Sequence, residues 1–287
     1  MRAIYRATAL ATVAAGAFTA LPASALPTSA INNGRMVLED DSGEFVLRRN
    51  NDNGFDAVTG RLEVGDLFGG VLDFTSVNGT PVGDYDTELT GIFLAELTNI
   101  NANGNTTRDG VTYQRGDFTF GQASNLMDAV FGIDPVDAGT FAHLYEDDAQ
   151  NLNLFSSNVG PTSQADAIAK ATDGDLFMQL GFGPDTTFQG FDAPLNLSIF
   201  SQVDAGTRVG DFNIDDALIT AYNGPGTLTS NTTDGNGSLF GVVNDNVFPV
   251  EDDLELTVQV VPAPSPLALL GVGLLGLGLA SRRGNRG

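Results

Sequence analysis

Short apolar stretches that recur between clusters of Asn, Asp and Gly constrain the fold of this chain more than any other feature. The clearest stretch is 254–260, where apolar residues at the even positions alternate with Glu255, Thr257 and Gln259. Alternation with a period of two is typical of a β-strand that buries one face. We expect further strands at residues 36–38, 44–48, 67–74, 92–97, 111–120, 176–182, 195–203 and 239–243. This pattern predicts an all-β domain, arranged as a β-sandwich or a jelly roll.

Two segments depart from the strand pattern. Residues 124–131 place apolar side chains at helical spacing behind Ser124, which is a suitable N-cap residue. Residues 162–171 follow Pro161 and indicate a second short helix. We expect both helices to pack on or between the sheets.

Residues 1–25 have the three parts of a secretory signal peptide. Arg2 and Arg6 supply the positive charge, and a stretch of small and apolar residues follows them. Ala23 and Ala25 fit the small-x-small rule for cleavage by signal peptidase. The sequence therefore predicts export and a folded domain over residues 26–261.

The C-terminal residues 262–287 have the features of a membrane stop. No charged residue occurs between Leu256 and Arg282, and residues 267–280 are wholly apolar. This apolar run is shorter than the roughly 20 residues that a comfortable helical span needs, so it makes a marginal permanent anchor. Arg282 and Arg283 are expected to stay on the cytoplasmic side of a transmembrane helix at 267–280.

The order of these parts resembles the PEP-CTERM sorting signal of Gram-negative bacteria. Pro262-Ala263-Pro264 stands where that family has Pro-Glu-Pro, and the apolar run and the Arg282-Arg283 pair follow in the family's order. The resemblance covers less than a tenth of the chain and concerns sorting alone. It implies transient anchoring in the inner membrane, recognition and cleavage by an exosortase, and a destination at the cell surface or outside the cell. Members of this family often accompany exopolysaccharide and biofilm systems.

The folded domain is strongly acidic. The chain has 13 Lys and Arg residues, of which five lie in the two terminal segments, and all 36 Asp and Glu residues lie between those segments. Residues 26–261 therefore keep eight basic residues and a net charge of −28. Such a domain repels nucleic acid, because phosphate binding needs clustered Lys and Arg, and it attracts cations.

Few residues of the chain suit catalysis. Cysteine is absent, which excludes disulfides and thiol chemistry within the chain. The one histidine, His143, lies in an apolar context that indicates a structural role, and no G-x-S-x-G motif occurs. A glycosidase needs two carboxyl groups at a defined separation, which sequence alone does not give. We therefore expect no catalytic residues.

Two acidic segments approach the ligand spacing of a calcium loop. In each segment the sixth position should be Gly, but Asp216 and Leu239 occupy it, so neither is an EF-hand. Each segment is therefore either a set of Asx-type turns or part of a calcium site, and calcium is the only cofactor that we consider. The candidate ligands are Asp211, Asn213, Asp215, Asp234, Asn236 and Asp245.

These observations favour an exported, non-enzymatic protein of the cell surface or of an exopolysaccharide-associated matrix. Signal peptidase and an exosortase would process it, and exopolysaccharide is the candidate partner. A calcium-assisted carbohydrate-binding or adhesin module is the first alternative. A polysaccharide hydrolase that acts through two carboxyl groups is the second.

Overall fold

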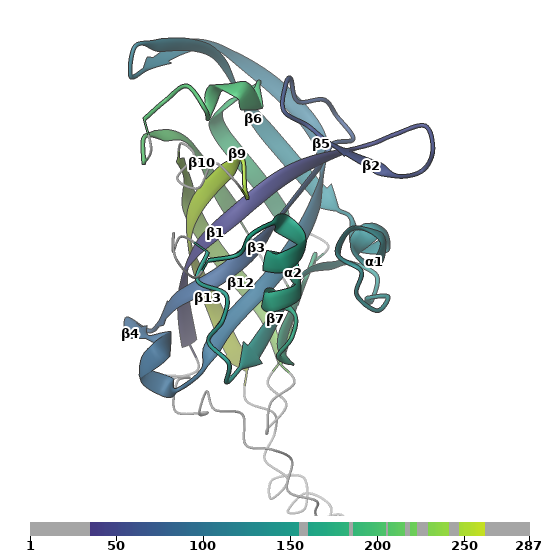
Figure 1. Ribbon diagram of the computed structural model, residues 1–287, viewed down its shortest axis with the longest axis vertical. Helices are drawn as coiled ribbons and strands as arrows, with labels where there is room; N and C mark the ends of the chain where they lie inside the picture. Colours follow the sequence, from purple (N-terminus) through teal and green to yellow (C-terminus); the bar gives the residue numbers. More distant parts are fainter. Residues whose placement is uncertain are drawn as a thin grey trace, which may run out of the picture.

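The computed structural model describes residues 35–154, 160–183, 186–204, 206–215, 219–222, 229–240 and 247–261. Within these residues the chain is mostly β (Figure 1). The strands are β1 (Arg35–Arg49), β2 (Phe55–Ala57), β3 (Leu67–Val77), β4 (Thr80–Pro81), β5 (Glu88–Arg108), β6 (Val111–Gln122), β7 (Thr140–Asp147), β8 (Asp175–Gly181), β9 (Thr187–Pro194), β10 (Arg208–Asp215), β11 (Ile219–Tyr222), β12 (Thr229–Phe240) and β13 (Val250–Val261). The helices are α1 (Met127–Phe131), α2 (Gln164–Ala171) and the 3-10 turns η2 (Val82–Tyr85), η3 (Ser124–Leu126) and η4 (Leu197–Ile199).

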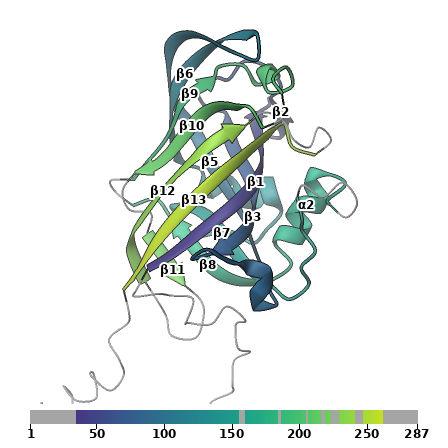
Figure 2. The same ribbon diagram turned by 90° about the vertical axis from the view of Figure 1, so that its left-hand side faces the viewer.

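The strands close on themselves into a barrel. The antiparallel order β10-β9-β6-β5-β3-β1-β13-β12 returns to β10, because β12 pairs with β10 as well as with β13. Figure 2 shows β10, β12, β13 and β1 side by side in this order. β1 and β13, the first and last described strands, are neighbours with a ten-residue register from Arg35–Gln259 to Glu44–Val250.

Part of the barrel wall consists of two tiers. The long strand β5 pairs along one edge with β6 through its second half and with β7 through residues Glu88 to Phe93. β12 likewise pairs with β10 over one part and with β11 at Thr229 and Ser230. The series β6-β9-β10 thus forms the upper tier, next to the β5–β6 hairpin, and β7-β8-β11 forms the lower tier.

Side chains alternate between the barrel interior and its outer face, as the strand geometry requires. On β13, Leu254, Leu256 and Val258 point inward and are at most 7 % exposed. Six phenylalanines of the strands extend this core, and their rings contact one another at centroid distances between 4.8 and 6.4 Å: Phe68, Phe93, Phe118, Phe120, Phe141 and Phe188. The interior is therefore a packed apolar core along most of its length.

A second, smaller core lies outside the barrel. Outward side chains of β1, β3 and β5, such as Phe45 and Ile92, are covered by α1, α2 and residues 152–154. Figure 1 shows both helices outside the strands. Met127 of α1 and Ala167 of α2 are fully buried in this contact. The two helices are packing elements on the sheet, as the sequence predicts.

The all-β prediction is confirmed, but the arrangement is a closed barrel where a sandwich or jelly roll was expected. A sandwich has two sheets with free edges, whereas here the pairing runs without a break from β10 round to β12. The same alternation of inward and outward side chains serves both architectures, so the pattern alone did not separate them.

Two local predictions were wrong. Ser124 does not cap α1; its hydroxyl accepts a hydrogen bond from the backbone N–H of Gly139 at 2.9 Å. The stretch 195–203 is not a strand, because it folds into the turns around η4, whose buried residues gave an apolar pattern like that of a strand. By contrast, the helix expected at 162–171 is present as α2, and its N-cap is Ser163, whose Oγ accepts from the backbone N–H of Asp166 at 3.1 Å.

The signal-peptide residues Ala23 and Ala25 and the sorting residues 262–287, with Arg282 and Arg283, lie outside the described residues, so these remain predictions. In the part of the chain that the structure describes, no helix is long and apolar enough to cross a membrane.

Candidate functional site

The pairing of β1 with β13 brings together the two most acidic stretches of the domain. Glu39 to Glu44 reads EDDSGE, and Glu251 to Glu255 reads EDDLE. Their antiparallel register places Ser42 opposite Asp252 and Asp41 opposite Asp253. Because side chains alternate, each stretch sends carboxyl groups both into the barrel and onto its outer face.

The inward residues form what we call the interior acid cluster: Asp40, Ser42, Glu44 and Asp252. All four are at most 4 % exposed. Ser42 donates a hydrogen bond from its hydroxyl to Oδ1 of Asp252, and the backbone N–H of Leu254 donates to Oδ1 of Asp40 at 3.2 Å. Among the described residues, no hydrogen-bond donor reaches Oδ2 of Asp40 or either carboxyl oxygen of Glu44, so these oxygens accept no hydrogen bond.

Burial controls the protonation of this cluster. It raises the pKa of Asp40 and of Glu44 well above the usual range, and the nearby charge of Asp252 adds to both shifts. Burial also raises the pKa of Asp252, to about 6, although hydrogen bonds from Glu44 and Ser42 oppose the rise. The carboxyl groups of Glu44 and Asp252 lie within hydrogen-bonding reach, so a proton on Glu44 can be donated to Asp252. The cluster therefore favours bound protons or another positive group.

The outward residues align in rows across β3, β1 and β13. In one row, Asp41 lies between Asp73 of β3 and Asp253 of β13. In the next row, Glu39 faces Glu255, and directly opposite residues lie about 4.5–5.5 Å apart. None of the ion pairs among the described residues involves these side chains. We call the group the outer acid face: Glu39, Asp41, Asp73, Glu251, Asp253 and Glu255.

Crowding of carboxylates and partial burial raise pKa values on the outer acid face. Burial raises the pKa of Asp73 to about 7, although a hydrogen bond from the backbone N–H of Leu154 opposes it. Burial, reinforced by Asp41, raises the pKa of Glu251 to about 7. The pKa of Asp41 rises through burial and through the charge of Asp253. The face thus carries more negative charge than its surroundings balance.

The predicted calcium ligands that fall within the described part of the chain lie on strands and not on loops. Asp211 and Asn213 of β10 pair with Ser238 and Asn236 of β12, next to Asp253 and Glu255 in the same two rows. Asp211 already forms an ion pair with Arg208. Asp211, Asn213 and Asn236 therefore lie on one face of two paired strands and not in a loop.

The other predicted ligands are outside what the structure describes. The backbones of Asp215 and Asp234 belong to β10 and β12, but their side chains are not described, and Asp245 lies outside the described residues. No group of three or more His, Cys, Asp or Glu side chains in the described part of the chain has an arrangement that could hold a metal ion.

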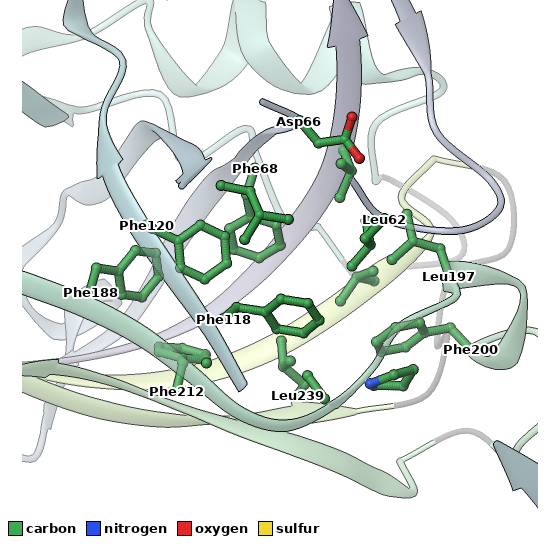
Figure 3. Close-up of a pocket in the computed structure, with 16 residues that line it drawn as sticks. Leu62, Asp66, Phe68, Phe118, Phe120, Phe188, Leu197, Phe200, Phe212 and Leu239 are labelled. Atoms are coloured by element: carbon green, nitrogen blue, oxygen red, sulfur yellow. The ribbon is translucent and has the colours of Figure 1, made fainter. Parts of the chain in front are cut away.

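The upper part of the barrel contains a small apolar cavity of about 40 Å³. Six phenylalanines contribute to its lining, and Asp66 is its single charged neighbour (Figure 3). Asp66 lies at the edge with its carboxylate pointing away from the rings, where Arg48 donates two hydrogen bonds to it at 2.7 and 2.8 Å. We call this space the upper cavity.

Two loops cover the upper cavity. The backbone N–H of Leu62 donates to the carbonyl of Leu195 at 3.0 Å, and that of Leu197 donates to the carbonyl of Gly60 at 2.9 Å. Leu62 and Leu197 line the cavity in Figure 3. The wall below is formed in part by Val250, which is the register partner of Glu44, so the interior acid cluster begins where the upper cavity ends.

His143 is a buried residue of β7 that contacts the neighbouring Tyr145. It is 9 % exposed, and its Nδ1 lies 3.3 Å from the hydroxyl of Tyr145. Burial lowers its pKa, so the ring is neutral at neutral pH. These contacts agree with the structural role that the sequence indicates.

Sequence reasoning missed the interior acid cluster. The signal was present, because Asp40, Ser42 and Glu44 continue the inward parity of Leu38, and Asp252 precedes Leu254 in the same parity. Carboxylates at such positions are rarely buried, so the stretches read as solvent-exposed turns.

No protein-family model, curated protein or solved structure matches this chain.

Proposed function

We propose that the chain is an exported, non-enzymatic protein of the cell surface or of an exopolysaccharide-associated extracellular matrix. The observation that carries the proposal is the outer acid face, on which β3, β1 and β13 align six carboxylates without a basic partner among the described residues. Such a surface stays hydrated and attracts cations, which in turn can link it to polyanionic polysaccharide.

The terminal segments support the same proposal. A signal peptide over residues 1–25 would deliver the chain across the inner membrane, and the PEP-CTERM-like tail would hold it there until an exosortase cleaves it. The protein would then reach the cell surface or the medium.

The intact mass of protein recovered from native cells tests this processing. We expect a chain that lacks residues 1–25 and the apolar run 267–280, found in the surface or matrix fraction. A secreted form that keeps the whole tail would contradict cleavage, and a cytoplasmic full-length form would contradict export.

A calcium-assisted carbohydrate-binding or adhesin module is a second candidate. It is favoured by the position of Asp211, Asn213 and Asn236 in the rows of the outer acid face. Thermal melting of the full chain in EDTA, in millimolar Ca²⁺, and in Mg²⁺ or NaCl of equal ionic strength distinguishes the two. A site filled to 100 times its dissociation constant stabilises by about 2.7 kcal/mol. A shift with Ca²⁺ alone supports the module, whereas equal shifts with every salt indicate screening of the acid face.

The hydrolase alternative has the weakest support. The two carboxyl groups in contact, Glu44 and Asp252, are buried in the barrel wall at 0 and 4 % exposure. A polysaccharide chain would need an open cleft to reach them.

A further inference from the structure

Small residues of β9 keep the upper cavity open. Gly190, Ala193 and Pro194 line it together with the six phenylalanines. A Cβ added to Gly190 would lie 3.4–3.7 Å from Phe118 and Phe120, which is ordinary van der Waals contact, and the φ of Gly190 is not positive. Neither crowding nor backbone conformation therefore requires glycine at this position. Glycine in the interior of a strand weakens it, and it is typical of a site where a ligand approaches the backbone closely.

The upper cavity is electrically neutral, although residues 26–261 carry a net charge of −28. Asp66 points its carboxylate away from the rings and is paired with Arg48 (Figure 3). On the side of the interior acid cluster, Phe188 and Phe212 close the space, with ring centroids 5.8 Å apart and ring planes at 84°. Both rings also line a smaller cavity that Asp252 borders, so they separate the upper cavity from this carboxyl group.

These surroundings select an uncharged hydrocarbon group. A charged or polar group would lose its hydration in this space and would find no partner in the apolar lining. Water has the same difficulty, because apolar cavities stay dry. Phenylalanine rings pack well against alkyl carbons. One water-sized group needs about 10–15 Å³, so the cavity has room for a group of about two or three carbon atoms.

The cover of the cavity provides an entrance. Two backbone hydrogen bonds and the bridge between Arg61 and Asn196 join residues 60–62 to residues 195–197. The walls below belong to paired strands of the barrel. Parting two loops breaks fewer hydrogen bonds than separating two strands, and loops open at lower free energy than core strands.

We propose that the upper cavity is a binding site for a small uncharged molecule with a hydrocarbon group of about two or three carbon atoms. The group enters where the two loops part. It then lies against the backbone of Gly190 and the rings of Phe118 and Phe120. The site recognises its ligand through shape and apolar contact.

The test is a titration of the full chain with dissolved cyclopropane, followed by NMR of the methyl groups of Leu97 and Leu239, which line the cavity. Propylammonium chloride is the charged probe of similar size. Leu144 is fully buried outside the cavity lining and serves as the internal control. We expect saturable shifts at Leu97 and Leu239 with cyclopropane, and none with propylammonium or at Leu144. No saturable shift with cyclopropane, equal shifts with propylammonium, or equal shifts at Leu144 would overturn the proposal.

Two variants locate the site. Gly190→Ala fills part of the cavity and should weaken cyclopropane binding by roughly tenfold or more, without loss of stability. Gly83→Ala, whose Cβ meets no neighbour within 4 Å and lies outside the cavity, should leave binding unchanged. Val250→Ile adds a methyl group from β13 and should also weaken binding, which keeps the question answerable if Gly190→Ala does not fold. Unchanged binding in a folded Gly190→Ala or Val250→Ile protein would refute the site.

Discussion

Replacing Asp252 by Asn tests the energetics of the interior acid cluster. Asn keeps the size of the side chain and can still accept a hydrogen bond from Ser42, but it has no ionisable proton. The groups that face position 252 inside the barrel are Asp40 and Glu44, and Asp253 and Glu251 flank it along β13. The substitution therefore removes one titrating group and leaves the packing nearly unchanged.

The size of the effect follows from the pKa. In the folded protein the pKa of Asp252 is raised to about 6, against the ordinary 3.8 in the unfolded chain. A difference of about two pKa units corresponds to about 3 kcal/mol. Below pH 4 the group is protonated in both states and costs nothing. Between pH 4 and 6 the unfolded chain has lost this proton while the folded protein still holds it, so the free energy of unfolding falls by about 3 kcal/mol over this interval and is constant on its account at higher pH.

Urea unfolding followed by circular dichroism at pH 4 to 8 measures this fall. We expect the parent to lose stability as pH rises from 4 to 7, and Asp252→Asn to lose about 3 kcal/mol less over that range. This amounts to roughly 6–12 °C in the melting temperature for a domain of this size. Glu255→Gln, an exposed position on the same strand, should follow the parent. An Asp252→Asn protein with the full pH-dependent loss, or a parent whose stability rises with pH over this range, would contradict a raised pKa of Asp252 in the folded protein.

Three further predictions concern the fold. Arg48→Ala removes the two charged hydrogen bonds to the buried Asp66 and should lower the free energy of unfolding in urea by about 3 kcal/mol. Arg49→Ala, at an exposed end of β1, should change it little, and equal effects of the two variants would contradict the role of the Arg48–Asp66 pair. The Cβ of Gly237→Ala would overlap the Asp253 carbonyl and the Phe212 ring, so this variant should lower the free energy of unfolding by about 1–3 kcal/mol. The control is Gly83→Ala, whose Cβ meets no neighbour within 4 Å. A Gly237→Ala protein as stable as Gly83→Ala would show that β12 packs differently. Ser163→Ala removes the N-cap of α2 and should cost about 1 kcal/mol, and Ser163→Asp should restore most of it; failure of that rescue would argue against capping.

The sequence predicted the local elements well where local interactions decide them. The alternation at 254–260 became part of β13, and the short helix predicted at 162–171 behind Pro161 became α2. In each case the signal lies within one turn or one strand, and no distant residue has to be known.

The closure of the barrel depends on contacts that no local pattern contains. The second half of β5, residues 98–108, is polar and reads as a loop, yet it pairs with β6 along its length. The barrel closes because β12 pairs with both β10 and β13. Alternating strands fit a sandwich and a barrel equally, so the architecture had to come from the pairing itself.

The interior acid cluster could be predicted only in part. The parity of Leu38 and Val46 on β1 places Asp40, Ser42 and Glu44 on the apolar face, and this information lies in the sequence. The pairing with Asp252 across more than 200 residues does not. Burial of these groups is tolerated because carboxyl groups with raised pKa values can keep their protons.

The most direct test of a carboxyl cluster inside the barrel is a titration of the side-chain carboxyl carbons by NMR. We expect the Asp252 signal to titrate near pH 6, and the signals of Asp40 and Glu44 to titrate well above the ordinary range for carboxyl groups. Asp252→Asn should shift both of the remaining titrations to lower pH, because a neighbouring negative charge is lost. Titration of all three groups near pH 4, as for exposed carboxylates, would contradict their position in the barrel interior.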